Sequence, residues 1–167
     1  MLYSKLSDFI SDWKNDSEST LKVFKNLTDS SLSQAVTPGE RTIGIIAWHI
    51  TSAIPEMMNR TGLNLGNFDE SKIEPVDVKD LISSYENYSN KLISEIESKW
   101  SDADMEKSVN MYGQEWKNGM TLQILISHQI HHRGQLTVLM RQAGLKVPGI
   151  MGPSKEEWAA MGMPPQK

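Results

Sequence analysis

The sequence contains no cysteine. Disulfide crosslinks, thiolate metal ligands and a cysteine nucleophile are therefore excluded. Any metal ion would have to be held by nitrogen and oxygen ligands. Any thiol chemistry would have to use a thiol that a substrate brings into the site.

Long hydrophobic runs and an excess of one charge are also missing. The longest mostly apolar run, Ile43 to Ile54, contains His49 and is far shorter than the ~20 residues that span a bilayer. Lys and Arg number 17 against 21 Asp and Glu, for a formal net charge of -4, which gives no general attraction for nucleic acid or anionic membranes. The first residues, MLYSKLSDFI, lack the features of a secretory signal. We therefore expect a soluble, cytoplasmic protein with neither a nucleic-acid nor a membrane partner.

What the sequence does contain is helical periodicity along most of its length. A chain of 167 residues fits a single domain, and we expect one that spans residues 1–167. Apolar residues at a spacing near 3.6 predict four long helices, and Ser154 with Glu157 forms a capping-box pattern that predicts a short C-terminal helix. The VNMYGQEW segment is compatible with a short hairpin. The predicted long helices span residues 6–27, 39 or 40 to 60, 78–99 and 120 or 121 to 143.

Four helices of this length predict an all-α fold, a four-helix bundle. The connection between the second and third helices is long enough to cross the bundle, so these two helices could run parallel. Pro55 lies inside the second helix, where proline removes one backbone hydrogen bond and clashes with the preceding turn. We expect a kink or an early end of the helix at Pro55.

Histidines are the most informative residues of the chain. Three of the four, His128, His131 and His132, lie within five residues, and His49 lies in another predicted helix. His128 and His132 are four residues apart, so their side chains share one helix face and can bind one metal ion at about 2.0–2.1 Å. The pair His128 and His131, three residues apart, could also converge on an ion. Spacing alone does not decide between the two pairs.

Each histidine signal is weak when taken alone. A buried neutral imidazole is commonly a hydrogen-bonded core residue, and a single HxxxH pair in a helix is modest support for a metal. Together, with no histidine elsewhere, they favour a metal site. Three protein ligands with a fourth position left to water are typical of catalytic rather than structural sites. Zn²⁺ suits imidazole ligands, while Ni²⁺, Fe²⁺ and Mn²⁺ stay open.

Three segments resemble one known family. HQIHHRGQLTVLMRQAGL resembles the last core helix of the DinB-like family of metalloenzymes, which includes the YfiT-type proteins. RTIGIIAWHI resembles the stretch that carries the first histidine ligand of that family, and VPGIMGPSKEEW resembles the end of many members. The resemblance extends from about Leu6 to Trp158.

The resemblance implies an up-down-down-up four-helix bundle that holds a divalent metal ion, often zinc or nickel, on His49, His128 and His132. His131 falls outside the ligand pattern, and a hydrogen bond near the site is its better interpretation. Activities known in the family include bacillithiol S-transfer and mycothiol-dependent isomerisation. The resemblance also implies a homodimer and a small-molecule substrate, with a low-molecular-weight thiol as the most concrete choice.

Five further residues have competing interpretations. Glu56 follows the first histidine by seven residues, so it is either a general base or hydrogen-bond acceptor at the site, or a solvated carboxylate. Gln129 or Gln135 could approach the site. Arg133 is predicted to form a surface or inter-helix ion pair, and Gly134 a close helix contact.

The leading hypothesis is thus a metal-dependent enzyme in which the ion activates water or a small thiol. Thiol transfer to a small electrophile is its most concrete form, and hydrolysis would use the same residues. The alternative is a non-catalytic bundle that binds a metal or a protein partner. No catalytic side chain, substrate or native metal is assigned from the sequence.

Overall fold

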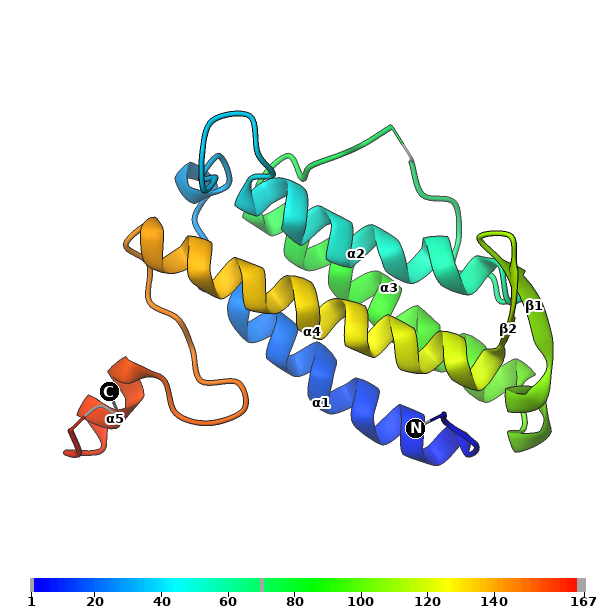
Figure 1. Cartoon of the computed structure of the whole chain (residues 1–167). Coiled ribbons are helices and arrows are strands. Elements are labelled where there is room, and N and C mark those ends of the chain that lie inside the picture. The colour runs from blue at the N-terminus through cyan, green and yellow to red at the C-terminus, as the bar shows by residue number, and fades with distance from the viewer. Residues whose placement is uncertain (1, 70, 165–167) are drawn as a thin grey trace.

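Four long helices make up most of the structure, a computed structural model that describes residues 2–69 and 71–164 (Figure 1). The chain is mostly helical, as predicted, and adds a small two-stranded sheet. None of the helices within the described residues is both long enough and apolar enough to cross a membrane. The elements in chain order are α1 Leu6–Phe24, the 3-10 turn η1 Asp29–Ser31, α2 Ile43–Asn59, α3 Val78–Lys99, the 3-10 turn η2 Asp102–Glu106, β1 Ser108–Met111, β2 Gln114–Lys117, α4 Asn118–Gln142 and α5 Lys155–Ala160.

The long helices share one hydrophobic core. Helix α1 packs against α3 and α4, and α2 packs against the same two helices. In Figure 1, α1 and α4 run in one direction and α2 and α3 in the other, with the connection over residues 60–77 leading back to the start of α3. The apolar periodicity of each helix supplies the shared interior. Its largest fully buried side chains include Trp13, Tyr85, Phe9, Phe24, Ile43, Ile50, Ile54 and Met58.

Helix ends follow their capping residues. Helix α3 has the predicted bounds, and the Asp77 side chain accepts a hydrogen bond from the Asp80 backbone N–H at 2.6 Å. Helix α2 begins at Ile43 rather than at residue 39 or 40, because the Thr42 side chain caps it by accepting from the Ile45 N–H at 3.2 Å. Helix α1 ends three residues earlier than predicted, and α4 begins two or three residues earlier.

Pro55 does not end α2, so the expectation of an early end is wrong. The helix continues to Asn59 with Pro55 buried inside it. Packing of this central helix outweighs the loss of one backbone hydrogen bond. The prediction for Gly134 is also wrong, since a Cβ placed there would meet nothing within 4 Å. Gly119 has the close contact instead: a Cβ there would lie 2.1 Å from the Tyr3 carbonyl oxygen.

The predicted hairpin is present and precedes α4. Strands β1 and β2 pair antiparallel, with Val109 opposite Trp116. Tyr112 and Gly113 form the turn with φ values of 55° and 81°. Two positive φ values are what the tight hairpin turn requires, and they place the Tyr112 side chain at the tip. The predicted capping box of α5 is confirmed as well.

A buried polar network joins α4 to α1 and α3. The Arg133 guanidinium, 4% exposed, donates to the Asp16 carboxylate at 2.6 Å, to the Asp16 carbonyl at 3.1 Å and to the Thr20 hydroxyl at 2.9 Å. One turn earlier, Gln129 accepts a hydrogen bond from the Tyr85 hydroxyl at 2.6 Å. The predicted ion pair of Arg133 is therefore inter-helix and buried.

Asp16→Ala is expected to lower the free energy of unfolding by about 3 kcal/mol, because it leaves the Arg133 guanidinium buried without its carboxylate. Urea unfolding followed by circular dichroism measures the change. Glu86→Ala is the matched control, since it breaks the Lys25–Glu86 pair, whose side chains are 58% and 44% exposed, and should change stability by less than about 1 kcal/mol. Equal effects of the two variants would contradict a stabilising role for the buried pair.

Candidate metal centre

Two neighbouring helices bring the three predicted histidine ligands together. His49 lies in the middle of α2, and His128 and His132 lie one turn apart on α4. The ring centroids are 4.7 Å apart for His49 and His128, 4.7 Å for His49 and His132, and 4.5 Å for His128 and His132. One ring nitrogen from each of the three residues lies within 4.8 Å of the others.

These distances suit a shared cation. A metal ion at about 2.0–2.1 Å from each imidazole separates adjacent ligand nitrogens by about 3.0–3.4 Å. His49 Nε2 and His128 Nε2 are 3.0 Å apart. Two lone pairs repel at that distance, so it requires either a hydrogen bond from one ring to the other or a cation between them. His128 Nδ1 is buried without a hydrogen-bond partner among the described residues.

Burial keeps the three imidazoles neutral. Desolvation, followed by the charges of His132 and His49, lowers the pKa of His128 to about 4. Desolvation also lowers the pKa of His49 and of His132. The charge of Arg41 contributes in the same direction at all three rings. Neutral rings at pH 7 present the lone pairs that metal binding needs.

Gln135 orients one of the three rings. Its Oε1 lies 2.8 Å from His132 Nδ1, which leaves His132 Nε2 for the cluster. Its Nε2 lies 3.2 Å from Nε2 of His131, an exposed residue outside the cluster. A hydrogen bond to the second ring nitrogen fixes the tautomer and orientation of a ligand histidine. Gln129, the other glutamine considered from the sequence, instead faces Tyr85 and Thr20.

A pocket of about 490 Å³ opens onto the histidines from the hairpin side. Glu56 lies in its wall, where the carboxylate accepts a hydrogen bond from the Tyr112 hydroxyl at 2.5 Å and from Arg60 Nε at 3.0 Å. Sequence reasoning considered Glu56 but missed Tyr112 and Trp116, although the predicted hairpin was the signal that could have found them. The lining residues are His49, Ser52, Ala53, Glu56, Met57, Tyr112, Trp116, Ile124 and His128.

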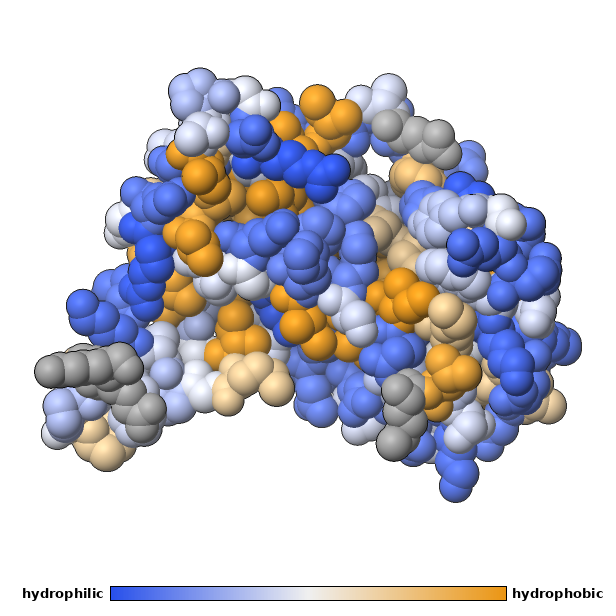
Figure 2. Space-filling model, in the orientation of Figure 1, coloured by the Kyte–Doolittle hydropathy of each residue, from blue (hydrophilic) through white to orange (hydrophobic). Residues whose placement is uncertain are grey.

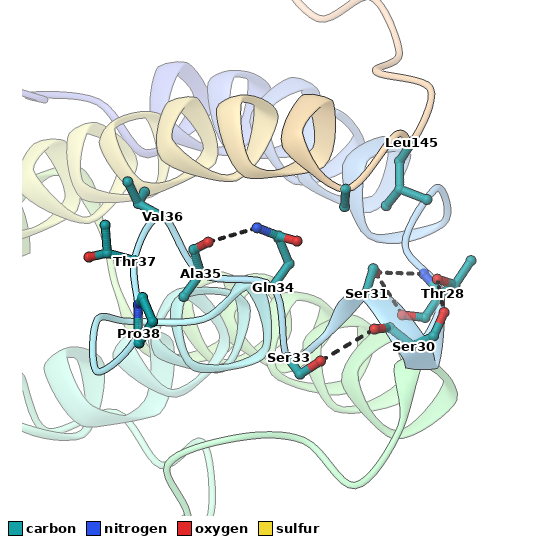
Figure 3. A pocket seen from close by; sticks show the side chains of 11 residues that line it. Thr28, Ser30, Ser31, Ser33, Gln34, Ala35, Val36, Thr37, Pro38 and Leu145 are labelled. Carbon is teal, nitrogen blue, oxygen red and sulfur yellow. Dashed lines mark hydrogen bonds between the residues drawn. The ribbon is translucent and has the colours of Figure 1, made fainter.

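Two other cavities differ in their relation to the histidines. One of about 620 Å³ is lined by Gln135 and Arg41 at the opposite end of the α2–α4 interface. Another of about 680 Å³ contains no histidine and is formed by residues 28–38 with Ala143 and Leu145 (Figure 3). Its hydroxyl groups bond mostly to their own segment, as Ser31 does to Thr28 at 2.7 Å. The histidine cluster therefore makes the α2–α4 interface the candidate site.

The fold and this cluster define a class: a helical protein with three neutral imidazoles arranged for one divalent cation. The chain belongs to the DinB family, whose match covers residues 1–167. The family resemblance stated from the sequence is thereby confirmed.

Relatives agree with this assignment. The uncharacterized protein YrdA of Bacillus subtilis (strain 168) is 41% identical over 162 residues, which is 97% of each chain. The crystal structure of a DinB-like protein from Bacillus cereus ATCC 10987 has a TM-score of 0.86 at 40% identity, over 89% of this chain and 99% of that chain. A DinB-like protein of B. subtilis, YjoA, shares the fold with a TM-score of 0.69 at 16% identity, over 87% of this chain and 99% of that chain.

Protein purified without a nickel column and supplemented with Zn²⁺ is expected to hold about one ion per chain. His49→Ala and His132→Ala should each abolish stoichiometric binding, because they leave too few ligands. His131→Ala is the matched control and should retain the ion. Metal content is measured by inductively coupled plasma mass spectrometry. Absence of metal in the wild-type protein, or its loss in His131→Ala alone, would contradict the site.

Gln135→Leu is expected to weaken Zn²⁺ affinity about tenfold, because the His132 ring loses the partner that orients it. Competition with a chromophoric chelator measures the affinity. Gln123→Leu, which removes a side chain whose hydrogen bond goes to Ser127 on the same helix, should bind as the wild type does. If both variants bind equally well, Gln135 does not position the ring.

Proposed function

We propose that this protein is a metal-dependent enzyme in which His49, His128 and His132 hold one divalent ion, and that the ion activates a small thiol for transfer to an electrophile. The observation that carries the proposal is the convergence of three neutral imidazoles beside a pocket of about 490 Å³. The size of the pocket is typical of small-molecule sites. Zinc and nickel are the metals that suit three imidazoles and the family resemblance best.

The direction of the helices supports the finer description of the fold. With α1 and α4 running one way and α2 and α3 the other (Figure 1), we assign the up-down-down-up four-helix bundle. This arrangement lets α2 and α4 face each other along their length, which is where the ligands lie. The homodimer and the thiol co-substrate stay predictions from the family resemblance, and the cytoplasmic location stays a prediction from the sequence.

The bound ion would supply positive charge that lowers the pKa of a thiol or of water. The apolar side chains Met57, Trp116 and Ile124 would bind the electrophile and exclude water beside His128. The thiol loses its proton to solvent or to Glu56, which lines the same pocket. The sulfur electron pair then forms the bond to the electrophilic carbon, and the leaving group departs with the electrons of the bond that breaks.

The Tyr112 hydroxyl has a structural part in this arrangement. Burial and the neighbouring Glu56 raise the pKa of Tyr112, so it stays protonated and donates to the carboxylate. The guanidinium of Arg60 lies 5.2 Å from the centre of the Tyr112 ring. These contacts fasten the hairpin tip to α2 and close one side of the pocket.

Zinc-loaded protein is expected to accelerate the reaction of bacillithiol, or another cellular thiol, with a fluorogenic alkyl halide. His49→Ala and chelator-treated protein should show only the uncatalysed rate, and returning Zn²⁺ to the chelated wild-type protein should restore turnover. Ester hydrolysis without thiol transfer would instead support the hydrolase alternative. Bound metal whose removal lowers only the melting temperature would support a non-catalytic bundle.

A further inference from the structure

The α2–α4 interface has a pocket on each side of the three histidines. The hairpin-side pocket, about 490 Å³, includes His49 and His128 in its wall. The second pocket, about 620 Å³, includes Gln135, whose amide contacts His132 at 2.8 Å. Both volumes suit small molecules. Figure 2 shows hydrophobic patches interrupted by hydrophilic surface on the face that presents α2 and α4.

The two pockets differ in how their charged side chains are paired. Arg41 lines the second pocket, where its guanidinium forms no ion pair with any of the described residues. Glu40 lines the same pocket, but its carboxylate forms no ion pair with the Arg41 guanidinium. Glu56 lines the hairpin-side pocket, where Tyr112 and Arg60 hold its carboxylate. Among the described residues, the second pocket therefore offers an unpaired guanidinium beside Glu40, whereas the carboxylate of the hairpin-side pocket is already paired with Arg60.

Each pocket favours a different kind of ligand. An exposed guanidinium binds carboxylates in a bidentate geometry, with apolar surface from Ile46 and Leu139 beside it. In the hairpin-side pocket, Glu56 is already paired with Arg60, while Trp116 and Ile124 offer apolar contact to an uncharged ligand. A molecule with a charged end and a reactive end would therefore lie with its charge toward Arg41 and its reactive end at the histidines.

We propose that Arg41 binds a carboxylate of the thiol co-substrate, and that the hairpin-side pocket takes an apolar electrophile, so that the two meet at the histidine cluster. This inference rests on the proposed function and deepens it. Arg41 is then a specificity-determining residue, and the thiol co-substrate carries a carboxylate. A neutral thiol of the same length would lack the contact.

Isothermal titration calorimetry of the zinc-loaded protein tests the proposal with two probes of matched length, 3-mercaptopropionate and 3-mercaptopropan-1-ol. We expect the carboxylate probe to bind about fivefold more tightly at low ionic strength, the range of a partly exposed ion pair, and the preference to shrink in 0.5 M salt. Arg41→Gln should remove the preference, and Arg41→Lys should keep part of it. Arg141→Gln is the matched control, since Arg141 pairs with Glu156 and lines neither pocket, and it should keep all of the preference.

The outcomes separate the two hypotheses. Equal binding of the two probes to the wild-type protein, or an undiminished preference in Arg41→Gln, would overturn the Arg41 subsite and leave thiol transfer standing. Failure of both probes to bind protein that carries its metal would overturn thiol transfer together with the subsite. Metal content and melting temperature of Arg41→Gln should match the wild type, because Arg41 is exposed.

Discussion

The rotational setting of α4 about its own axis is the constraint on which the candidate metal centre depends. His128 and His132 form one pair on this helix, and Gln129 and Arg133 form a second pair one residue further along. Successive residues turn by about 100° around a helix, so the two pairs face different neighbours. The second pair meets α1 and α3 through buried hydrogen bonds, and the first meets α2. A rotation of α4 would separate Arg133 from its partners, and the buried charge thus holds the histidines in place from an adjacent face of the helix.

Because one face of α4 contacts α1 and α3 and another contacts α2, α4 has buried residues on several sides. Most helices of a small protein bury one apolar stripe, whereas α4 buries Gln129, His132 and Arg133 along with its leucines. Directional polar contacts specify a helix rotation more sharply than apolar packing does, because each donor needs a particular acceptor. The cost is that neutral imidazoles and a buried guanidinium must all be satisfied. A bound cation would satisfy the imidazoles and so couple metal binding to the stability of the fold.

Local signals in the sequence predicted the helices well and their ends less well. Asp77 caps α3, which has the predicted bounds. Thr42 caps α2, which begins three or four residues after the predicted start. The convergence of His49 with His128 and His132 followed from their spacing and from the family resemblance together. The predicted hairpin could have pointed to Tyr112, but nothing in the sequence pointed to Arg41, since an arginine that precedes a helix reaches the interface only through tertiary packing. Pro55 shows the same limit in reverse, because the packing of α2 overrides a local breaking signal.

The directions of α2 and α4 determine what lies on each side of the histidine cluster. Because α2 and α4 run in opposite directions (Figure 1), the start of α2 lies beside the end of α4, and the end of α2 lies beside the start of α4. Arg41 precedes α2, whereas Glu56 lies near its end and meets the hairpin that leads into α4. The antiparallel pairing therefore separates the two charges along the groove, with the histidines between them. Two pockets, one on each side of the histidines, suit the proposed reaction, which joins two unlike molecules.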